Sequence, residues 1–101
     1  MPKLAILVEF EIAESQETEL VALLAEHARL TLEEEAGCLV FDLIRPIERD
    51  GTPIPNRLLL TEIYDSEAAV AVHEKNPRMP GLLNAITPLL VSMKQTLGRI
   101  D

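Results

Sequence analysis

The segment Asn56–Pro77 reads NRLLLTEIYDSEAAVAVHEKNP and contains the pattern of a strand, a turn and a helix in succession. From Arg57 to Tyr64, apolar side chains occur at both alternating sets of positions, which is typical of a strand covered on both faces. Ser66 then offers an oxygen that can cap a helix from Glu67 to about Lys75, and Asn76-Pro77 ends that helix. The segment therefore predicts one strand followed directly by one short helix.

The residues before this segment predict two more strands and a long helix. Leu4–Ile12 has apolar side chains at every even position, which is the period of a strand. Ser15 is the expected N-cap of a helix that continues to Glu35 and ends at Gly37. Cys38–Ile44 is again apolar at both sets of alternating positions, so we expect a second strand there.

The residues after the segment complete one domain over residues 1–101. Pro80 can open a second short helical piece, Gly81–Ile86, which Pro88 closes. The alternation of Leu89–Ile100 predicts a last strand. The order is β-α-β-β-α-β with an extra helical turn, which predicts an α+β fold of the ferredoxin-like kind: one antiparallel sheet with helices on one face.

The predicted sheet has one face without a cover. Its strands carry apolar residues on both faces, and no part of the chain remains to cover the second face. With 48% hydrophobic residues, the chain also has more apolar surface than one thin layer hides. Another copy of the same sheet is the simplest cover, so we expect a homodimer formed by sheet-to-sheet packing.

The composition indicates which other partners to expect. Seventeen acidic against nine basic side chains give a formal charge of −8, which repels the phosphates of nucleic acids and anionic membranes. No apolar stretch approaches the roughly 20 residues that span a bilayer, and the start lacks the pattern of a secretory signal. We therefore expect a cytoplasmic protein that binds neither nucleic acid nor membrane, with its lone Cys38 as a small buried hydrophobe.

Two stretches resemble the antibiotic biosynthesis monooxygenase (ABM) family of dimeric α+β barrels: EEEAGCLVFDL at Glu33–Leu43, and the segment Asn56–Pro77 with Glu62, Tyr64 and His73. The resemblance implies a homodimer whose two sheets pack face to face, with a small-molecule pocket between sheet and helices in each subunit. It also implies activities that include cofactor-free oxygenation of phenols and quinols, isomerisation and, in one branch, haem degradation.

The chain differs from this family at two places. Tyr64 occupies a position that is often Trp, and the residues after His73 are Asn76, Arg78 and Met79 where many relatives have a second His or a Thr. Haem degradation is the least favoured activity, because that branch relies on Trp and on an Asn in the first strand. The polar residues of the first strand here are Lys3, Glu9 and Glu11.

His73, His27 and Tyr64 are the predicted catalytic residues. His73 shares the inward face of its helix with Ala69 and Val70 and is the first candidate for a base, while His27 lies within the apolar stripe of the long helix and is the second. Tyr64 could hydrogen-bond a substrate oxygen. For each of the three, simple packing in the core is the alternative.

The predicted substrate-binding residues are Glu62, Leu60, Phe41 and Thr31. For Glu62 we also weigh a structural ion pair with Arg45, Arg57 or the sister subunit. The run Glu33–Glu35 is expected to be a solvated helix end and not a metal site, because neither His stands at ligand spacing from it.

No cofactor is expected, because the sequence lacks a glycine-rich phosphate loop, a CxxC and an HExxH. The leading hypothesis is a cofactor-independent monooxygenase acting on a small phenolic or quinol-like substrate. The alternatives are an isomerase that shuttles a proton on a small hydroxy-ketone or lactone, and a non-catalytic dimeric protein that binds a small molecule.

Overall fold

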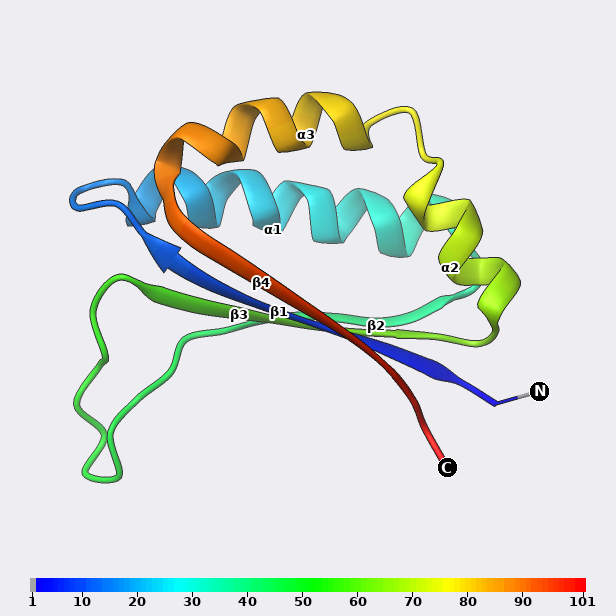
Figure 1. The fold of residues 1–101 in the computed structure, drawn as a ribbon, viewed down its shortest axis with the longest axis horizontal. Helices are drawn as coiled ribbons and strands as arrows, with labels where there is room; N and C mark the ends of the chain where they lie inside the picture. The colour runs from blue at the N-terminus through cyan, green and yellow to red at the C-terminus, as the bar shows by residue number, and fades with distance from the viewer. Residues whose placement is uncertain (1) are drawn as a thin grey trace.

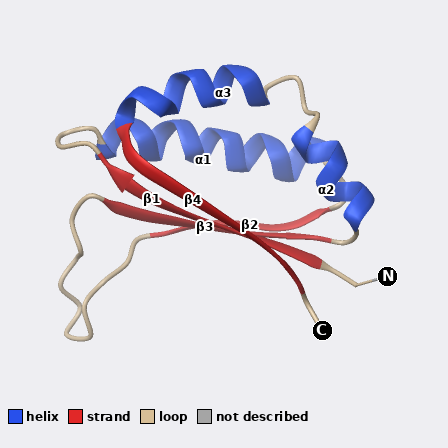
Figure 2. Cartoon of the chain, in the orientation of Figure 1, coloured by secondary structure: helices blue, strands red, loops and turns tan. Residues whose placement is uncertain are grey.

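The computed structural model describes residues 2–101 and shows one twisted sheet with the helices on one of its faces (Figure 1, Figure 2). This confirms the predicted α+β, ferredoxin-like fold. The elements in chain order are β1 (Leu4–Ile12), α1 (Glu17–Glu34), β2 (Cys38–Ile44), β3 (Arg57–Tyr64), α2 (Glu67–Glu74), α3 (Met79–Ile86), the 3-10 turn η1 (Thr87–Leu89) and β4 (Leu90–Arg99). Within residues 2–101, no helix is long and apolar enough to cross a membrane.

The sheet has the strand order β2-β3-β1-β4, and every neighbouring pair is antiparallel. In the centre of β1, Val8 lies opposite Leu60 of β3 and Gln95 of β4. The even residues of β1 from Ile6 to Ile12 are buried under the helices, as the period of two predicts. This register places Leu60, Glu62 and the side chains opposite them on the helix-covered face.

The helix starts show one correct and one wrong prediction. Ser66 caps α2, because its hydroxyl oxygen accepts a hydrogen bond from the backbone N–H of Ala69 at 3.2 Å. The prediction that Ser15 caps α1 is wrong: Ser15 has left-handed backbone with φ of 69°, and Gln16 occupies the cap position without a side-chain hydrogen bond. The tight turn after β1 moves the serine one residue too early to cap the helix.

The second crossover contains two helices. The helical piece that we expected from Gly81 begins two residues earlier, at Met79, so Pro80 lies inside its first turn, where its missing N–H costs nothing. In Figure 1, α3 lies alongside α1, and the two helices are in contact. Together with α2 they form a single helical layer over the sheet.

The face of the sheet that points away from the helices carries apolar side chains, as predicted. Leu7 is 45% exposed and Ile44 is 40% exposed on this face. The edge strand β4 is exposed along nearly its whole length, and Met93 and Leu97 remain about half exposed although they lie opposite the buried Phe10 and Ile6. The single chain therefore leaves an apolar face and an apolar edge uncovered.

Cys38 is buried at the start of β2, as expected of a small hydrophobe. Burial raises the pKa of its thiol to about 11, so the thiol stays protonated at neutral pH. Since the thiolate is the reactive form, this cysteine is a packing residue in the folded chain.

Gly37 joins α1 to β2 where the chain passes very close to α2. A Cβ at this position would lie 2.5 Å from the Cβ of Ala69. We therefore expect Gly37→Ala to lower the free energy of unfolding by about 1–3 kcal/mol in urea denaturation, through overpacking. In the double variant with Ala69→Gly the loss should be smaller than the sum of the two single losses.

Gly81 is the matched control for this substitution. It lies in α3, and a Cβ there would have no neighbour within 4 Å. Gly81→Ala should leave stability unchanged or raise it by up to about 1 kcal/mol, because alanine is the better helix former. Equal effects at the two glycines would show that the contact with Ala69 does not matter.

Candidate functional site

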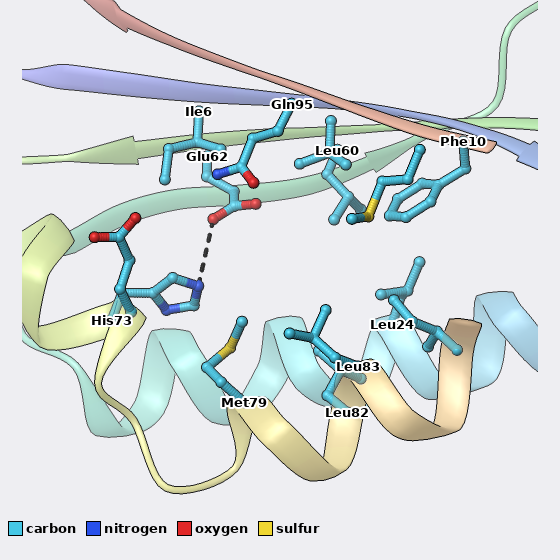
Figure 3. Close-up of a pocket in the computed structure, with 14 residues that line it drawn as sticks. Ile6, Phe10, Leu24, Leu60, Glu62, His73, Met79, Leu82, Leu83 and Gln95 are labelled. Atoms are coloured by element: carbon cyan, nitrogen blue, oxygen red, sulfur yellow. Dashed lines mark ion pairs between the residues drawn. The ribbon is translucent and has the colours of Figure 1, made fainter. Parts of the chain in front are cut away.

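A cavity of about 290 Å³ lies between the sheet and the helices (Figure 3). Its volume is at the lower end of the range for small-molecule sites. The apolar lining residues are Ile6, Val8, Phe10, Leu24, Leu60, Met79, Leu82, Leu83, Ile86 and Met93, and the polar ones are Glu62, His73, Glu74 and Gln95. Such a cavity can hold a small, mostly apolar molecule that has polar groups at one end.

His73 and Glu62 form the buried polar end of this cavity. His73 comes from the last turn of α2 and Glu62 from β3, and each residue is 4% exposed. The imidazole Nε2 lies 3.7 Å from Glu62 Oε1, with both groups pointing into the cavity in Figure 3. This distance is too long for a hydrogen bond, so Nε2 is free to meet a third group.

Tyr64 supports Glu62 from within the core. Its hydroxyl donates a hydrogen bond of 2.7 Å to Glu62 Oε1, so the expected partners Arg45 and Arg57 are not the ones that Glu62 contacts; Arg57 pairs with Glu11 instead. Burial raises the pKa of Glu62, and the hydroxyl of Tyr64 and the imidazole of His73 oppose this rise. Burial, with the Glu62 carboxyl beside it, also raises the pKa of Tyr64, which therefore remains a donor.

Glu35 holds the other side of the His73 ring. Both of its carboxylate oxygens lie 3.1 Å from His73 Nδ1, and Asn76 Nδ2 donates a hydrogen bond of 2.9 Å to Oε2. The prediction of a solvated run Glu33–Glu35 is therefore wrong for Glu35, which is 6% exposed. The helix ends at Glu34 and the backbone of Glu35 is already extended, which turns its side chain inward.

A signal in the sequence could have found Glu35. His27, Thr31 and Glu35 follow one another at intervals of four residues, so a helix that continued to Glu35 would carry all three along one stripe. His27 and Thr31 both belong to the buried face of this helix. A carboxylate on a buried stripe needs a hydrogen-bond donor, and the two histidines of the chain are the candidates.

His27 lies behind His73 and does not line the cavity. Its ring centroid is 5.5 Å from that of His73 and 5.4 Å from that of Phe41, which it meets edge to face. Arg78 Nη1 donates a hydrogen bond of 3.0 Å to His27 Nδ1. Burial, together with the charges of His73 and Arg78, lowers the pKa of His27 to about 4, so its ring is neutral at neutral pH.

The structure brings the seven predicted site residues together in two groups. Leu60, Glu62 and His73 line the cavity. Tyr64, His27, Phe41 and Thr31 lie outside it; the rings of the first three are 5.2–6.3 Å from that of His73, and Thr31 is fully buried. Sequence reasoning missed Gln95 and Met93, because β4 looked like any alternating strand.

Acid is expected to destabilise the fold through His27. Its pKa is about 4 in the folded chain and about 6.5 when unfolded, so the unfolded state binds the proton more tightly. The neutral His27 ring therefore contributes about 2 kcal/mol to the free energy of unfolding. This contribution is complete above a pH of about 6.5 and is lost as the pH falls toward about 4. Urea denaturation across this range should show a shallower pH dependence in His27→Gln than in the parent, and identical dependences would refute this role.

Comparison with known proteins places the chain among relatives of the same shape. The model of the antibiotic biosynthesis monooxygenase family matches residues 4–80. A Bacteroides thetaiotaomicron protein described as a candidate oxidoreductase is similar at 18% identity and a TM-score of 0.84, covering 98% of both chains. A candidate antibiotic biosynthesis monooxygenase of Deinococcus radiodurans has 21% identity and a TM-score of 0.82, covering 97% of this chain and 92% of its own.

A protein of Mycobacterium tuberculosis is similar at 26% identity and a TM-score of 0.79, covering 98% of this chain and 96% of its own. These relatives share the arrangement of one sheet and a helical layer over nearly the whole chain. Within residues 2–101, no group of three His, Cys, Asp or Glu side chains is placed to hold a metal ion.

Proposed function

The chain belongs to the antibiotic biosynthesis monooxygenase family, and on that premise we propose that it is a cofactor-independent monooxygenase of a small phenolic or quinol-like substrate. The family supports a monooxygenase-like function in general. The observation that carries the finer proposal is the form of the cavity: an apolar chamber that ends at an imidazole nitrogen without a hydrogen-bond partner. A base at the end of an apolar pocket is what deprotonation of a phenol requires.

The reaction needs only the substrate and dioxygen. His73 Nε2 takes the phenolic proton, and the resulting phenolate gives one electron to O₂. The phenoxyl radical and superoxide recombine into a peroxide at a ring carbon that bears hydrogen. The protonated His73 returns its proton to the peroxide, which then loses water, with the second hydrogen from the ring carbon, and leaves a carbonyl. One oxygen atom therefore enters the product, the other leaves as water, and the substrate supplies all the electrons.

The polar groups of the cavity have separate tasks in this scheme. The Glu62 carboxyl, held by the Tyr64 hydroxyl, stands beside the imidazole that becomes positive when it takes the proton. Gln95 lines the cavity from β4 near Glu62 in Figure 3 and offers an amide to a second substrate oxygen. Tyr64 therefore acts through Glu62, and Gln95 is the direct anchor.

An oxygen electrode tests this function. Purified protein is screened with a panel of one- and two-ring hydroquinones, at a substrate size that a 290 Å³ cavity admits. We expect oxygen uptake above the spontaneous rate for at least one quinol. Conversion of a substrate without oxygen uptake would support the isomerase instead, and binding without conversion would support a non-catalytic protein.

We also propose that two copies pack through the open faces of their sheets. Leu7 and Ile44 support this, because each is at least 40% exposed on the open face of the sheet in the single chain. A cover of this kind replaces half of a core, so the total buried area should be roughly 2,000 Å² or more.

Leu7→Glu tests the dimer against a matched control. Leu7 on the open face and Leu32 on α1 are both 45% exposed, so Leu32→Glu introduces the same charge at the same exposure. In an obligate dimer Leu7→Glu should unfold the protein, while Leu32→Glu should change the free energy of unfolding by less than about 0.5 kcal/mol. A stable 11.2 kDa species in sedimentation of the parent at micromolar concentration would contradict the proposal.

A further inference from the structure

We infer that Glu35 is a positioning residue that keeps the proton of the neutral His73 ring on Nδ1 and so leaves Nε2 as the base that faces the cavity. The inference rests on the proposed function and adds a residue to it. Glu35 does not line the cavity; it contacts His73 from the end of α1. Its effect on a substrate would therefore pass through the imidazole.

The hydrogen bonds around Glu35 define which group donates. The backbone N–H of Arg78 donates to Asn76 Oδ1 at 2.9 Å, which fixes the orientation of the Asn76 amide. Asn76 Nδ2 must then donate to Glu35 Oε2, as its distance of 2.9 Å shows. An ionised carboxylate only accepts, so the contacts of 3.1 Å with His73 require a proton on Nδ1.

The opposite nitrogen has no such partner. Glu62 Oε1 lies 3.7 Å from Nε2, beyond hydrogen-bond distance, and this oxygen already accepts a shorter hydrogen bond from Tyr64. The neighbouring His27 accepts from Arg78 and is neutral at neutral pH, so it adds no competing charge. When Nε2 takes a proton from a substrate, the positive ring stands between the carboxyl groups of Glu35 and Glu62.

A structural ion pair with a doubly protonated His73 ring would also join the end of α1 to α2, but it would leave no bare nitrogen to act as a base. The two possibilities differ in a property that can be measured without any substrate. Two-bond proton–nitrogen correlation spectra report which nitrogen of each imidazole carries the proton, and the chain has only two histidines to assign. His27→Gln identifies the signals of His73 by elimination.

In the parent protein we expect the neutral His73 ring to show a protonated Nδ1 and a bare Nε2. In Glu35→Gln, Asn76 still donates to the side-chain oxygen, so the new NH₂ group takes the other carboxylate position, which also lies 3.1 Å from Nδ1. An NH₂ donor repels a proton on Nδ1, so the tautomer with the proton on Nε2 should gain population. Glu33→Gln is the matched control: it removes a carboxylate two residues away that pairs only with Arg29 at the surface, and it should leave the tautomer unchanged.

A parent spectrum with the proton on Nε2 overturns the inference, even if Glu35→Gln does not fold. So does a folded Glu35→Gln variant with an unchanged tautomer. With a quinol that the parent oxidises, Glu35→Gln should lower kcat at least about tenfold with little change in KM, since a wrong tautomer removes the base and not the binding walls. If no quinol is oxidised but the tautomer is as expected, the proposed reaction fails and the positioning role stands.

Discussion

Replacing His73 by alanine is expected to lower quinol-dependent oxygen uptake by about 10²–10⁴-fold, the usual cost of removing a positioned base. The apolar walls of the cavity come from other residues, so KM should change much less than kcat. The measurement is steady-state oxygen consumption, with circular dichroism to verify the fold.

His73→Ala also leaves Glu35 and Glu62 without their shared partner, which could unfold the protein. His73→Gln covers that case, because its amide can still hydrogen-bond carboxyl groups but cannot take the proton. His27→Gln is the comparison for catalysis: its ring lies outside the cavity, so kcat should stay within a few-fold of the parent. The assignment of His73 as the base would be refuted if both His73 variants consumed oxygen at the rate of the parent protein. It would also be refuted if His27→Gln lost as much of kcat as the His73 variants.

Among substitutions inside the core of the single chain, the largest loss of stability is expected from Tyr64→Ala. The Tyr64 side chain is completely buried, so its removal opens a cavity and deprives the buried Glu62 of its hydrogen-bond donor. We expect a decrease of about 3–5 kcal/mol in the free energy of unfolding. Urea denaturation at constant pH measures it.

Tyr64→Phe separates the two causes of this loss. It keeps the ring and removes only the hydroxyl, so the cost should be about 1–3 kcal/mol. The pKa of Glu62 should then rise further, since the hydroxyl hydrogen bond is the larger of the two effects that oppose burial. If Tyr64→Ala lowered the free energy of unfolding by less than about 1 kcal/mol, the pair of Tyr64 and Glu62 would not be stabilising the core.

The fold could be predicted from the sequence because local patterns and tertiary burial agree. The even residues of β1 from Ile6 to Ile12 are apolar in sequence and buried in the structure, and Ser66 is the N-cap of α2 as the sequence predicts. The Ser15 cap failed because the left-handed turn at that residue moves the start of α1 by one position. Such a turn depends on how the chain leaves the sheet, which composition does not reveal.

The site was only partly predictable. His73 and Glu62 were found because each is a polar residue on an otherwise apolar face. Glu35 was missed because three consecutive acids look solvated, although the extended backbone after α1 turns the last of them inward. Gln95 was missed for another reason: only the sheet register shows that it stands opposite Val8 on the helix side.

The most direct test of the account uses isotopically labelled dioxygen with the quinol that gives the highest oxygen uptake. Mass spectrometry of the product measures how many labelled atoms it contains. A monooxygenase should place one labelled oxygen atom in each product molecule, and His73→Gln should nearly abolish this incorporation. A product that has the mass of the substrate, or that carries oxygen only from the solvent, would contradict monooxygenation at this cavity.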